Sequence, residues 1–549
     1  MNSDIKVAFI NPPISTTTTA SMLTWGYLKT YYNHKGKYPH KIEWIEPPYK
    51  FDKYNTVEDV YDEIGDADIF LFSSYIWNYQ INKKIALYVK KQKPQSITML
   101  GGPQVDVNSE DLIKDNPMYD YINVPTSPGE LFLLDFLDKY FEQDDLPEPK
   151  FIPYEARSSV KLPWEFIDIN PYGESFDYFS KLYQYSKSNN LTYYTSFETS
   201  RGCPFKCTYC EWGGGTGTKI KKKSISTVKD ELDSLHKIGI DYAYYTDANF
   251  GAFKDRDLEI LKYANSLGIA LTNISMLKTT NLKKNIELWD SVYDIQNASP
   301  LNTKHSIVPS ISIQSINPEA LRIAKRKSLS LEDHIKFAQH LKTKNRKPYI
   351  ELIRGMPGST LDDFYEETNI IFTIDPLGES EQNRFDYMML PDTEVAQEAK
   401  ENKYGIVTVD VYIDEEVTMD KDVFVSKLYK NNKSYYKTIS YCDSYTQDDG
   451  VQMLMMTFVL NYVMRRFYSE DIGLSSKEFS IATWKAIQHI NGFREIYNEF
   501  YDILNPKTPT RSIYQILGRD RTIVVNEWIK TNETDIQSWI YAEAFAEIA

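Results

Sequence analysis

The sequence predicts an α/β protein in three parts: a doubly wound parallel sheet, a partial barrel of six strand–helix units, and a mainly helical C-terminal region. The first two parts are predicted by one pattern that occurs twice. Short apolar strands alternate with amphipathic helices both before and after a proline-rich stretch. A second observation predicts the last part, where long helical spacing replaces the strands. We expect a sheet domain at residues 1–140, a linker at 141–190 and a barrel at 191–400. Residues 401–549 should form a C-terminal domain that shapes the substrate pocket or caps the barrel.

The sheet domain contains five apolar runs that read as strands. Continuous apolar strands are typical of a parallel sheet with helices on both faces, and such sheets bind ligands beyond the carboxyl ends of their strands. The runs are Val7–Pro13, Lys41–Pro48, Asp68–Tyr75, Ser96–Asp106 and Tyr119–Val124. The helix that follows Trp77 has one apolar face, formed by Ile81, Ile85, Ala86 and Val89.

The linker and barrel follow. Between Glu142 and Phe166 four prolines with mixed charge indicate an extended segment. Six strands with helices between them then predict a barrel or partial barrel of six βα units. They are Tyr193–Ser200, Tyr242–Asn249, Ala270–Leu277, Val308–Ser315, Tyr349–Met356 and Phe385–Leu390. In the C-terminal region, the Met, Leu and Val residues of Val451–Tyr468 are interpreted as core.

The composition excludes several classes of protein. With 42% hydrophobic and 25% charged residues, the chain reads as a globular protein, without a transmembrane run or signal peptide, so a cytoplasmic location and no membrane partner are expected. A net charge of −15 argues against a nucleic-acid partner, because binding phosphates requires clustered positive charge. The basic run Lys219–Lys223 is interpreted as a solvated turn.

Three of the four cysteines lie within eight residues, with the spacing C-x3-C-x2-C, at Cys203, Cys207 and Cys210. A zinc site normally needs four ligands, and no Cys or His follows at finger spacing. Three thiolates on a 4Fe–4S cluster leave one iron open to bind a cofactor or substrate. The spacing therefore favours a catalytic cluster with these three cysteines as its ligands.

This cysteine motif, with Tyr209 before its last cysteine, resembles the signature of the radical S-adenosylmethionine (SAM) superfamily. The resemblance implies that SAM chelates the open iron and is cleaved reductively to a 5′-deoxyadenosyl radical. It also implies a six-strand partial barrel, which agrees with the strand count. An electron donor, a reductase or a flavodoxin or ferredoxin, is then expected as a partner.

Later phrases resemble the SAM contacts of that superfamily. The segment TDANFG would support the SAM amino group, with Asp247 and Asn249 as polar candidates. Ser312, Gln314 and Arg326 would face the ribose and carboxylate, and the phrase around Gly355 would close over the adenine. With Tyr209, these residues are the predicted cofactor-binding set.

The N-terminal part resembles the cobalamin (B12)-binding domain of one branch of the superfamily, in its INPP, SSYIWN, GGP and SPGE phrases. The Asp-x-His-x-x-Gly motif, which supplies a lower histidine ligand, is absent from the sequence. The branch implies cobalamin-dependent methyl transfer to an unactivated carbon of a small-molecule or peptide substrate, whose identity is not readable.

Two alternatives stay open. Without cobalamin, hydrogen abstraction such as peptide epimerisation would need a hydrogen donor, and Cys442 is the one cysteine outside the motif. The plainer interpretation of Cys442 is an inert buried thiol. A non-catalytic iron–sulfur protein is the third possibility, which detection of SAM cleavage would exclude.

Overall fold

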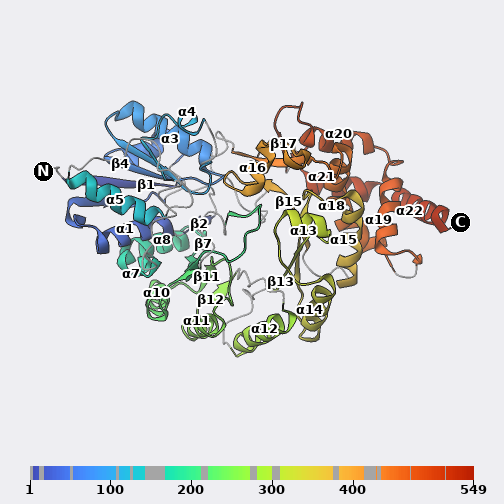
Figure 1. The fold of residues 1–549 in the computed structure, drawn as a ribbon, viewed down its shortest axis with the longest axis horizontal. Coiled ribbons are helices and arrows are strands. Elements are labelled where there is room, and N and C mark those ends of the chain that lie inside the picture. Colours follow the sequence, from blue (N-terminus) through green and yellow to red (C-terminus); the bar gives the residue numbers. More distant parts are fainter. Residues whose placement is uncertain are drawn as a thin grey trace.

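The structure is a computed structural model of the chain. It describes residues 4–548 apart from 12–17, 21, 50–53, 107–110, 124–127, 143–166, 212–219, 273–280, 299–308, 375–381, 413–427, 429–433, 470–471, 514 and 518. Figure 1 shows the chain following an arc, from the blue N-terminal sheet through green and yellow barrel strands to the orange and red C-terminal helices. In the described part of the chain, no helix is long and apolar enough to cross a membrane.

The N-terminal part is a five-stranded parallel sheet, with all five predicted strands present. Its order is β3-β1-β4-β5-β6, so the topological switch point lies between β1 and β4. The strands are β1 (Ile5–Ile10), β3 (Ile42–Ile45), β4 (Ile69–Ser73), β5 (Ile97–Gly101) and β6 (Tyr121–Ile122). The helices are α1 (Leu23–Lys35), α2 (Val57–Ile64), α3 (Tyr79–Gln92), α4 (Leu112–Asp115) and α5 (Gly129–Glu142).

Both faces of this sheet are covered by helices. On one face, Val7 and Phe9 belong to the same core cluster as side chains of α1 and α5. On the other, Ala8 and Ile10 belong to a second cluster with α2 and α3. The predicted apolar face of α3 is entirely buried. Together with the barrel strands below, this confirms the predicted α/β fold class.

Residues 167–190, inside the predicted linker, contain two helices that we did not expect, α7 (Pro171–Glu174) and α8 (Phe176–Ser188). The rings of Tyr178 on α8 and Trp25 on α1 lie 4.7 Å apart, and both side chains are buried. The apolar spacing of α8 is visible in the sequence, with Tyr178, Phe179, Leu182 and Tyr183 buried on one face. That run, at residues 143–166, lies outside the described residues.

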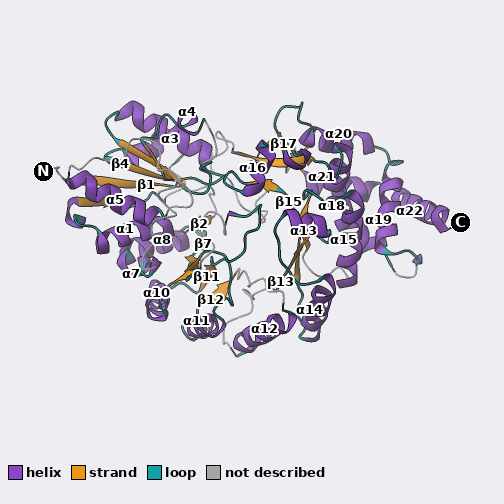
Figure 2. Ribbon diagram, viewed as in Figure 1, coloured by secondary structure: helices purple, strands orange, loops and turns teal. Residues whose placement is uncertain are grey.

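The barrel consists of two three-stranded parallel sheets, β12-β11-β8 and β13-β14-β15, within the described residues. Their strands are β8 (Ser196–Phe197), β11 (Tyr242–Tyr245), β12 (Ala270–Thr272), β13 (Ser310–Gln314), β14 (Tyr349–Arg354) and β15 (Gln382–Asp386). Figure 2 shows the helices along the outside of these strands. These helices are α10 (Ile225–Ile238), α11 (Lys254–Ser266), α12 (Leu282–Asn297), α13 (Pro318–Ile323), α14 (Leu331–Thr343) and α15 (Leu361–Ile374).

Two predicted barrel strands differ in detail. The first divides into three pieces with different partners. β7 (Thr192–Tyr194) pairs with β2 (Thr18–Ala20), β8 pairs with β11, and β9 (Ser200–Arg201) pairs with β10 (Lys221–Lys222). The predicted strand Phe385–Leu390 combines the end of β15 with β16 (Met388–Met389), which belongs to another sheet.

The C-terminal region is mainly helical but also carries the four-stranded sheet β16-β18-β17-β19, which sequence analysis did not predict. Its strands β17 (Val407–Tyr412) and β18 (Tyr435–Tyr441) are antiparallel, and β19 (Arg511–Ser512) and the hairpin β20 (Gln515–Ile516) and β21 (Arg519–Asp520) follow. The helices are α16 (Glu394–Lys400), α18 (Gln447–Phe467), α19 (Ser476–Ile487), α20 (Phe493–Leu504), α21 (Arg521–Thr531) and α22 (Glu533–Ile548). The apolar side chains of α18 are mostly buried, as predicted.

Candidate active site

The cysteine motif lies on a well-anchored loop that follows β8 and β9. The backbone N–H of Thr208 donates to Ala324 O at 3.1 Å, and the Thr208 carbonyl accepts from Val395 N at 3.0 Å. Thr208 is buried, whereas Cys203, Cys207 and Cys210 are only half-buried. The loop is therefore fixed at its centre while its thiols remain accessible.

The motif supplies three thiols, one ligand fewer than a structural zinc site normally takes. A single zinc ion holds its ligands at about 2.0–2.3 Å, and in the described part of the chain no group of three or more His, Cys, Asp or Glu side chains is placed to hold one metal ion. A 4Fe–4S cluster binds each cysteine through a different iron, so its thiolates are spread around a wider body. The donor set fits a cluster with one open iron.

Three predicted SAM contacts meet beside this loop. The guanidinium of Arg326 donates through Nη1 to the Tyr209 hydroxyl at 3.1 Å and through Nη2 to Ser312 O at 2.7 Å. Its Nε is buried and has no hydrogen-bond partner among the described residues. Burial raises the pKa of the Tyr209 phenol despite Arg326. Arg326 thus links the cysteine loop to β13, and its Nε–H is available to donate to a ligand.

On the inner face of the barrel, Ser312 donates its hydroxyl to Glu351 on β14, in register. Sequence analysis did not single out Glu351, although it alternates with apolar residues along the predicted strand Tyr349–Met356. Gln314, predicted as a contact, is buried with φ of +70° at an irregularity in the β13–β14 pairing. Such irregularities redirect side chains next to active sites.

Asp247 and Asn249, after β11, differ in how their polar atoms are used. Asp247 accepts from the Thr199 N–H at 2.6 Å and from the Thr199 and Ser200 hydroxyls at 2.7 Å each. Burial raises the pKa of Asp247 to about 6 against these hydrogen bonds. The buried Nδ2 of Asn249 has no partner among the described residues. Asp247 therefore supports the strand end before the cysteines, and Asn249 offers the available donor.

Glu211, directly after Cys210, was missed altogether. Burial raises the pKa of Glu211 to about 8, and the neighbouring Asp392 adds to this. Nothing in the sequence marks it, because its desolvation depends on what packs around it.

The loop that contains Gly355 is hydrogen-bonded to the segment that contains Cys442, although the two are far apart in the sequence. Gly355 has φ of +77°, and its carbonyl accepts from the Tyr445 hydroxyl at 3.1 Å. The buried Cys442 Sγ lies 3.2 Å from Ser444 Oγ, which accepts from Gly358 N at 3.0 Å. Cys442 therefore packs behind the loop that follows β14, and its role as hydrogen donor stays a prediction.

A further connection reaches the same loop from the C-terminal region. Arg354, the last residue of β14, is buried and pairs with Asp386 at the end of β15. Its Nη1 donates to the carbonyl of Gly450 on α18 at 3.4 Å. The end of the barrel and the start of α18 are thus bonded to each other.

The carboxyl ends of the N-terminal strands carry amides, hydroxyls and aromatic rings. Asn78 donates to Asn11 Oδ1 at 3.1 Å and to Ser73 O at 2.9 Å. Tyr75 and Trp77 stack at 4.6 Å, and Trp77 is 40% exposed. None of the loops after β1, β4 and β5 contains a histidine.

This edge has two buried acceptors that are available to a ligand, and a tight glycine turn. The buried Asn82 Oδ1 and Gln104 Oε1 lack hydrogen-bond partners among the described residues. Gly102 has φ of +99°, and a Cβ there would lie 2.5 Å from Ser74 O, so the turn accepts only glycine. The edge fits a corrinoid held through its periphery, without a histidine on cobalt.

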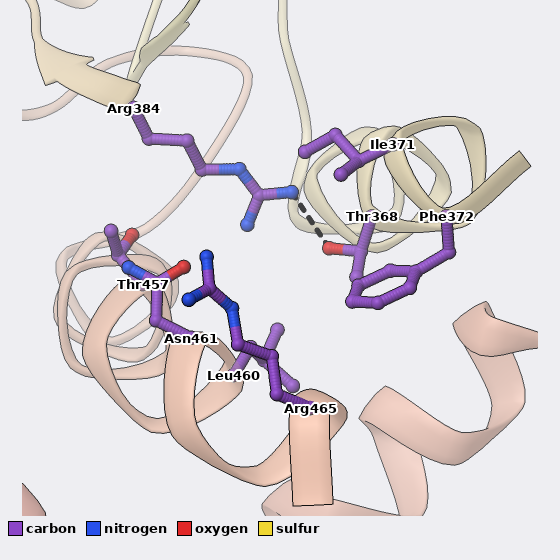
Figure 3. Close-up of a pocket in the computed structure, with 8 residues that line it drawn as sticks. All are labelled: Thr368, Ile371, Phe372, Arg384, Thr457, Leu460, Asn461 and Arg465. Atoms are coloured by element: carbon purple, nitrogen blue, oxygen red, sulfur yellow. Dashed lines mark hydrogen bonds between the residues drawn. The ribbon is translucent and has the colours of Figure 1, made fainter. Parts of the chain in front are cut away.

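Figure 3 shows a small pocket between α15, β15 and α18 that does not belong to this site. Arg384 and Arg465 point into it, and Arg384 donates to the Thr368 hydroxyl at 2.7 Å and covers the Phe364 ring at 4.2 Å. Arg384 is in register with Leu352, on the strand face opposite to Glu351. The pocket therefore opens on the outside of the barrel.

A doubly wound sheet, a partial barrel and three thiols at the carboxyl ends of its strands are the arrangement implied by the resemblance to radical SAM enzymes with an N-terminal cobalamin-binding-like domain. Residues 197–369 match the Radical SAM superfamily model, so the predicted resemblance is confirmed.

Relatives of known activity support this class. The chain is 26% identical over 417 residues to 2-(S-pantetheinyl)-carbapenam-3-carboxylate methyltransferase of Streptantibioticus cattleyicolor. It is 25% identical over 419 residues to the cobalamin-dependent radical SAM methyltransferase TokK of Streptomyces tokunonensis. Both alignments cover 73% of this chain and 58% of the relative, so the chain spans less than two thirds of their length.

Solved structures share the fold. TsrM from Kitasatospora setae, with cobalamin and a 4Fe–4S cluster bound, has a TM-score of 0.57 at 12% identity and covers 92% of this chain and 99% of its own. OxsB with aqua-cobalamin and SAM bound has a TM-score of 0.54 at 13% identity, covering 99% and 79%.

Proposed function

We propose that this chain is a radical SAM enzyme that methylates an unactivated carbon of a small molecule with the help of bound cobalamin. The observation that carries the proposal is the accessible three-thiol loop, which is hydrogen-bonded through Tyr209 and Arg326 to strand β13. Beside it, in the same chain, stands a parallel sheet whose strand ends fit a corrinoid. The relatives' names point to the same chemistry.

In this proposal Cys203, Cys207 and Cys210 hold a 4Fe–4S cluster. When bound, the cluster supplies the electron that cleaves SAM to a 5′-deoxyadenosyl radical. Arg326 and Asn249 offer buried donors to the polar groups of SAM. Asp247 keeps the start of the loop in place through Thr199 and Ser200.

Cobalamin would occupy the strand ends of the N-terminal sheet. When bound, it relays a methyl group from SAM towards the substrate. Asn82 and Gln104 would accept hydrogen bonds from the amide periphery of the corrin, and the Tyr75–Trp77 stack offers an apolar surface. The loops after β1, β4 and β5 would offer this cofactor no histidine ligand.

The substrate class proposed is a small molecule. One relative is named for a carbapenam carboxylate and another, from Streptomyces laurentii, for tryptophan. A peptide substrate is the competing possibility from sequence analysis. The electron donor is proposed to be a flavodoxin, a ferredoxin or their reductase.

The test is anaerobic purification from cobalamin-fed cells, followed by absorbance and mass analysis. We expect a stoichiometric corrinoid beside the iron–sulfur absorbance, and both S-adenosylhomocysteine and 5′-deoxyadenosine after reduction with SAM. An intact cluster that forms 5′-deoxyadenosine without any corrinoid would overturn methyl transfer. It would leave hydrogen abstraction with Cys442 as the donor.

A further inference from the structure

Arg201 lies two residues before Cys203 and joins two parts of the molecule. Its Nε and Nη2 donate to the two carboxylate oxygens of Glu198 at 3.0 and 2.8 Å. Its Nη1 donates to Glu130 Oε1 at 3.0 Å. Glu198 lies between β8 and β9 of the barrel, whereas Glu130 stands on the first turn of α5, which packs on the N-terminal sheet.

The surroundings of this ion pair are largely closed to water. Glu130 is 5% exposed, and the ring of the buried Tyr27 on α1 lies 5.3 Å from the Arg201 guanidinium. The same ring lies 4.9 Å from Lys223 Nζ, which pairs with Glu231 where both side chains are fully buried. Two helices of the N-terminal part thus contact two cations of the barrel.

We propose that Arg201 is a positioning residue that fixes the cysteine loop relative to the N-terminal sheet, so that Glu130, Arg201 and Glu198 set the separation between the two cofactor sites. The functional part of this inference rests on the proposed methyl transfer. The geometric part concerns this chain's own residues.

The physical argument has two steps. A bidentate arginine–carboxylate pair restricts both distance and orientation, and Arg201 makes one with Glu198 while its remaining nitrogen reaches Glu130. Without the Glu130 carboxylate, Arg201 keeps Glu198 as its counterion but loses the charge-assisted hydrogen bond that reaches α5. Loss of Glu130 should therefore release the barrel loop from the N-terminal part without touching any cluster ligand.

Loosening this contact should affect one SAM reaction more than the other. Formation of 5′-deoxyadenosine needs only SAM at the cluster. Formation of S-adenosylhomocysteine needs the SAM methyl group to reach the reduced corrinoid, which takes it as a methyl cation while the sulfonium sulfur keeps the electron pair. Displacements of about 1 Å cost about a hundredfold in rate when two reacting groups must meet.

The first experiment is hydrogen–deuterium exchange on the full-length, anaerobically purified protein and its Glu130→Gln variant. We expect amides in residues 196–206 and 128–136 to exchange about tenfold faster or more in the variant, because their shared contact is lost. The matched control is Glu142→Gln at the other end of α5, where Glu142 pairs with the exposed Lys37. Unchanged exchange in Glu130→Gln, or equal acceleration in Glu142→Gln, would overturn the proposed positioning role of Arg201.

The second experiment measures the ratio of S-adenosylhomocysteine to 5′-deoxyadenosine after reduction. We expect this ratio to fall about tenfold in Glu130→Gln and to recover in part in Glu130→Asp, which keeps the charge. A variant that merely unfolds would lose both products together, and this result would overturn positioning. If the unaltered protein forms no S-adenosylhomocysteine, the proposed methyl transfer is wrong. The exchange experiment still decides whether the Glu130–Arg201 contact fixes the cysteine loop.

Discussion

The barrel and the N-terminal sheet both present a site at the carboxyl ends of parallel strands, but with different chemistry. The barrel edge carries three thiols, a guanidinium with an unused Nε, and buried carboxyl groups. The N-terminal edge carries amides, hydroxyls and stacked rings, without a histidine on its three loops. The barrel would hold its cofactor through bonds to metal, the sheet through shape and hydrogen bonds. Metal ligation leaves a spaced cysteine motif in the sequence. Binding through shape and hydrogen bonds leaves a weaker sequence signal.

Replacing the cysteines should separate the two edges most strongly. Cys203→Ala, Cys207→Ala and Cys210→Ala should each abolish iron–sulfur absorbance and SAM cleavage, because the thiolates are the proposed ligands. Corrinoid content should be unchanged. Cys442→Ala is the control and should keep SAM cleavage. Cleavage retained in any motif variant would contradict the cluster assignment.

Two glycines allow a matched test of the same comparison. Gly102→Ala should reduce corrinoid content but not the cluster, because the added Cβ would meet Ser74 O at 2.5 Å. Gly355→Ala should weaken SAM binding but not corrinoid binding, because its Cβ would lie 2.9 Å from the Tyr445 hydroxyl. Each strained turn should also cost about 1–2 kcal/mol of stability. Calorimetry with each cofactor measures both effects, and loss of both cofactors in either variant would contradict separate sites.

Arg326→Gln should weaken SAM binding by about 10- to 100-fold, the expected loss for hydrogen bonds from a charged donor. Equilibrium titration with SAM measures it, with corrinoid content as the internal reference. Arg322→Gln provides the control, because Arg322 pairs with Glu319 on the same helix at the exposed surface. Equal effects of the two substitutions would remove Arg326 from the SAM site.

Mild acid should affect the barrel through His334, which is 6% exposed. Burial, together with the nearby Arg326, lowers the pKa of His334 from 6.5 to about 4. The folded state then binds fewer protons than the unfolded state between these values, so stability is full above pH 6.5 and falls as the pH drops towards 4. The loss is small near pH 6 and reaches about 3 kcal/mol at pH 4. Thermal unfolding of His334→Asn between pH 7 and 5 should show a weaker pH dependence than the unaltered protein, and identical slopes would contradict this assignment.

Much of the fold was predictable because strands buried on both faces leave continuous apolar runs. All five N-terminal strands and the buried face of α3 follow from such runs. The pieces β7, β8 and β9 could not be separated in advance, because their boundaries depend on three different partner strands. Strands β17 and β18 were missed because they pair with each other in a region dominated by helical spacing.

In the candidate site, the sequence motif led to the cysteines, and the resemblance led to Tyr209, Ser312 and Arg326, which are hydrogen-bonded together. The roles of these residues stay predictions. Glu211 could not be predicted, because its burial exists only in the folded chain, whereas the alternation along β14 could have marked Glu351. Glu130 was quoted in the SPGE phrase, but its partner Arg201 is 71 residues away in the sequence.

Two hydrogen bonds join the C-terminal region to the end of β14. The Tyr445 hydroxyl donates to the Gly355 carbonyl, and Arg354 donates to the Gly450 carbonyl. Modular exchange of this region between homologues would therefore alter the turn proposed to cover the adenine. Chimeras that seek a new substrate range should carry residues 350–359 and 440–452 from one parent together, because these two segments are hydrogen-bonded to each other.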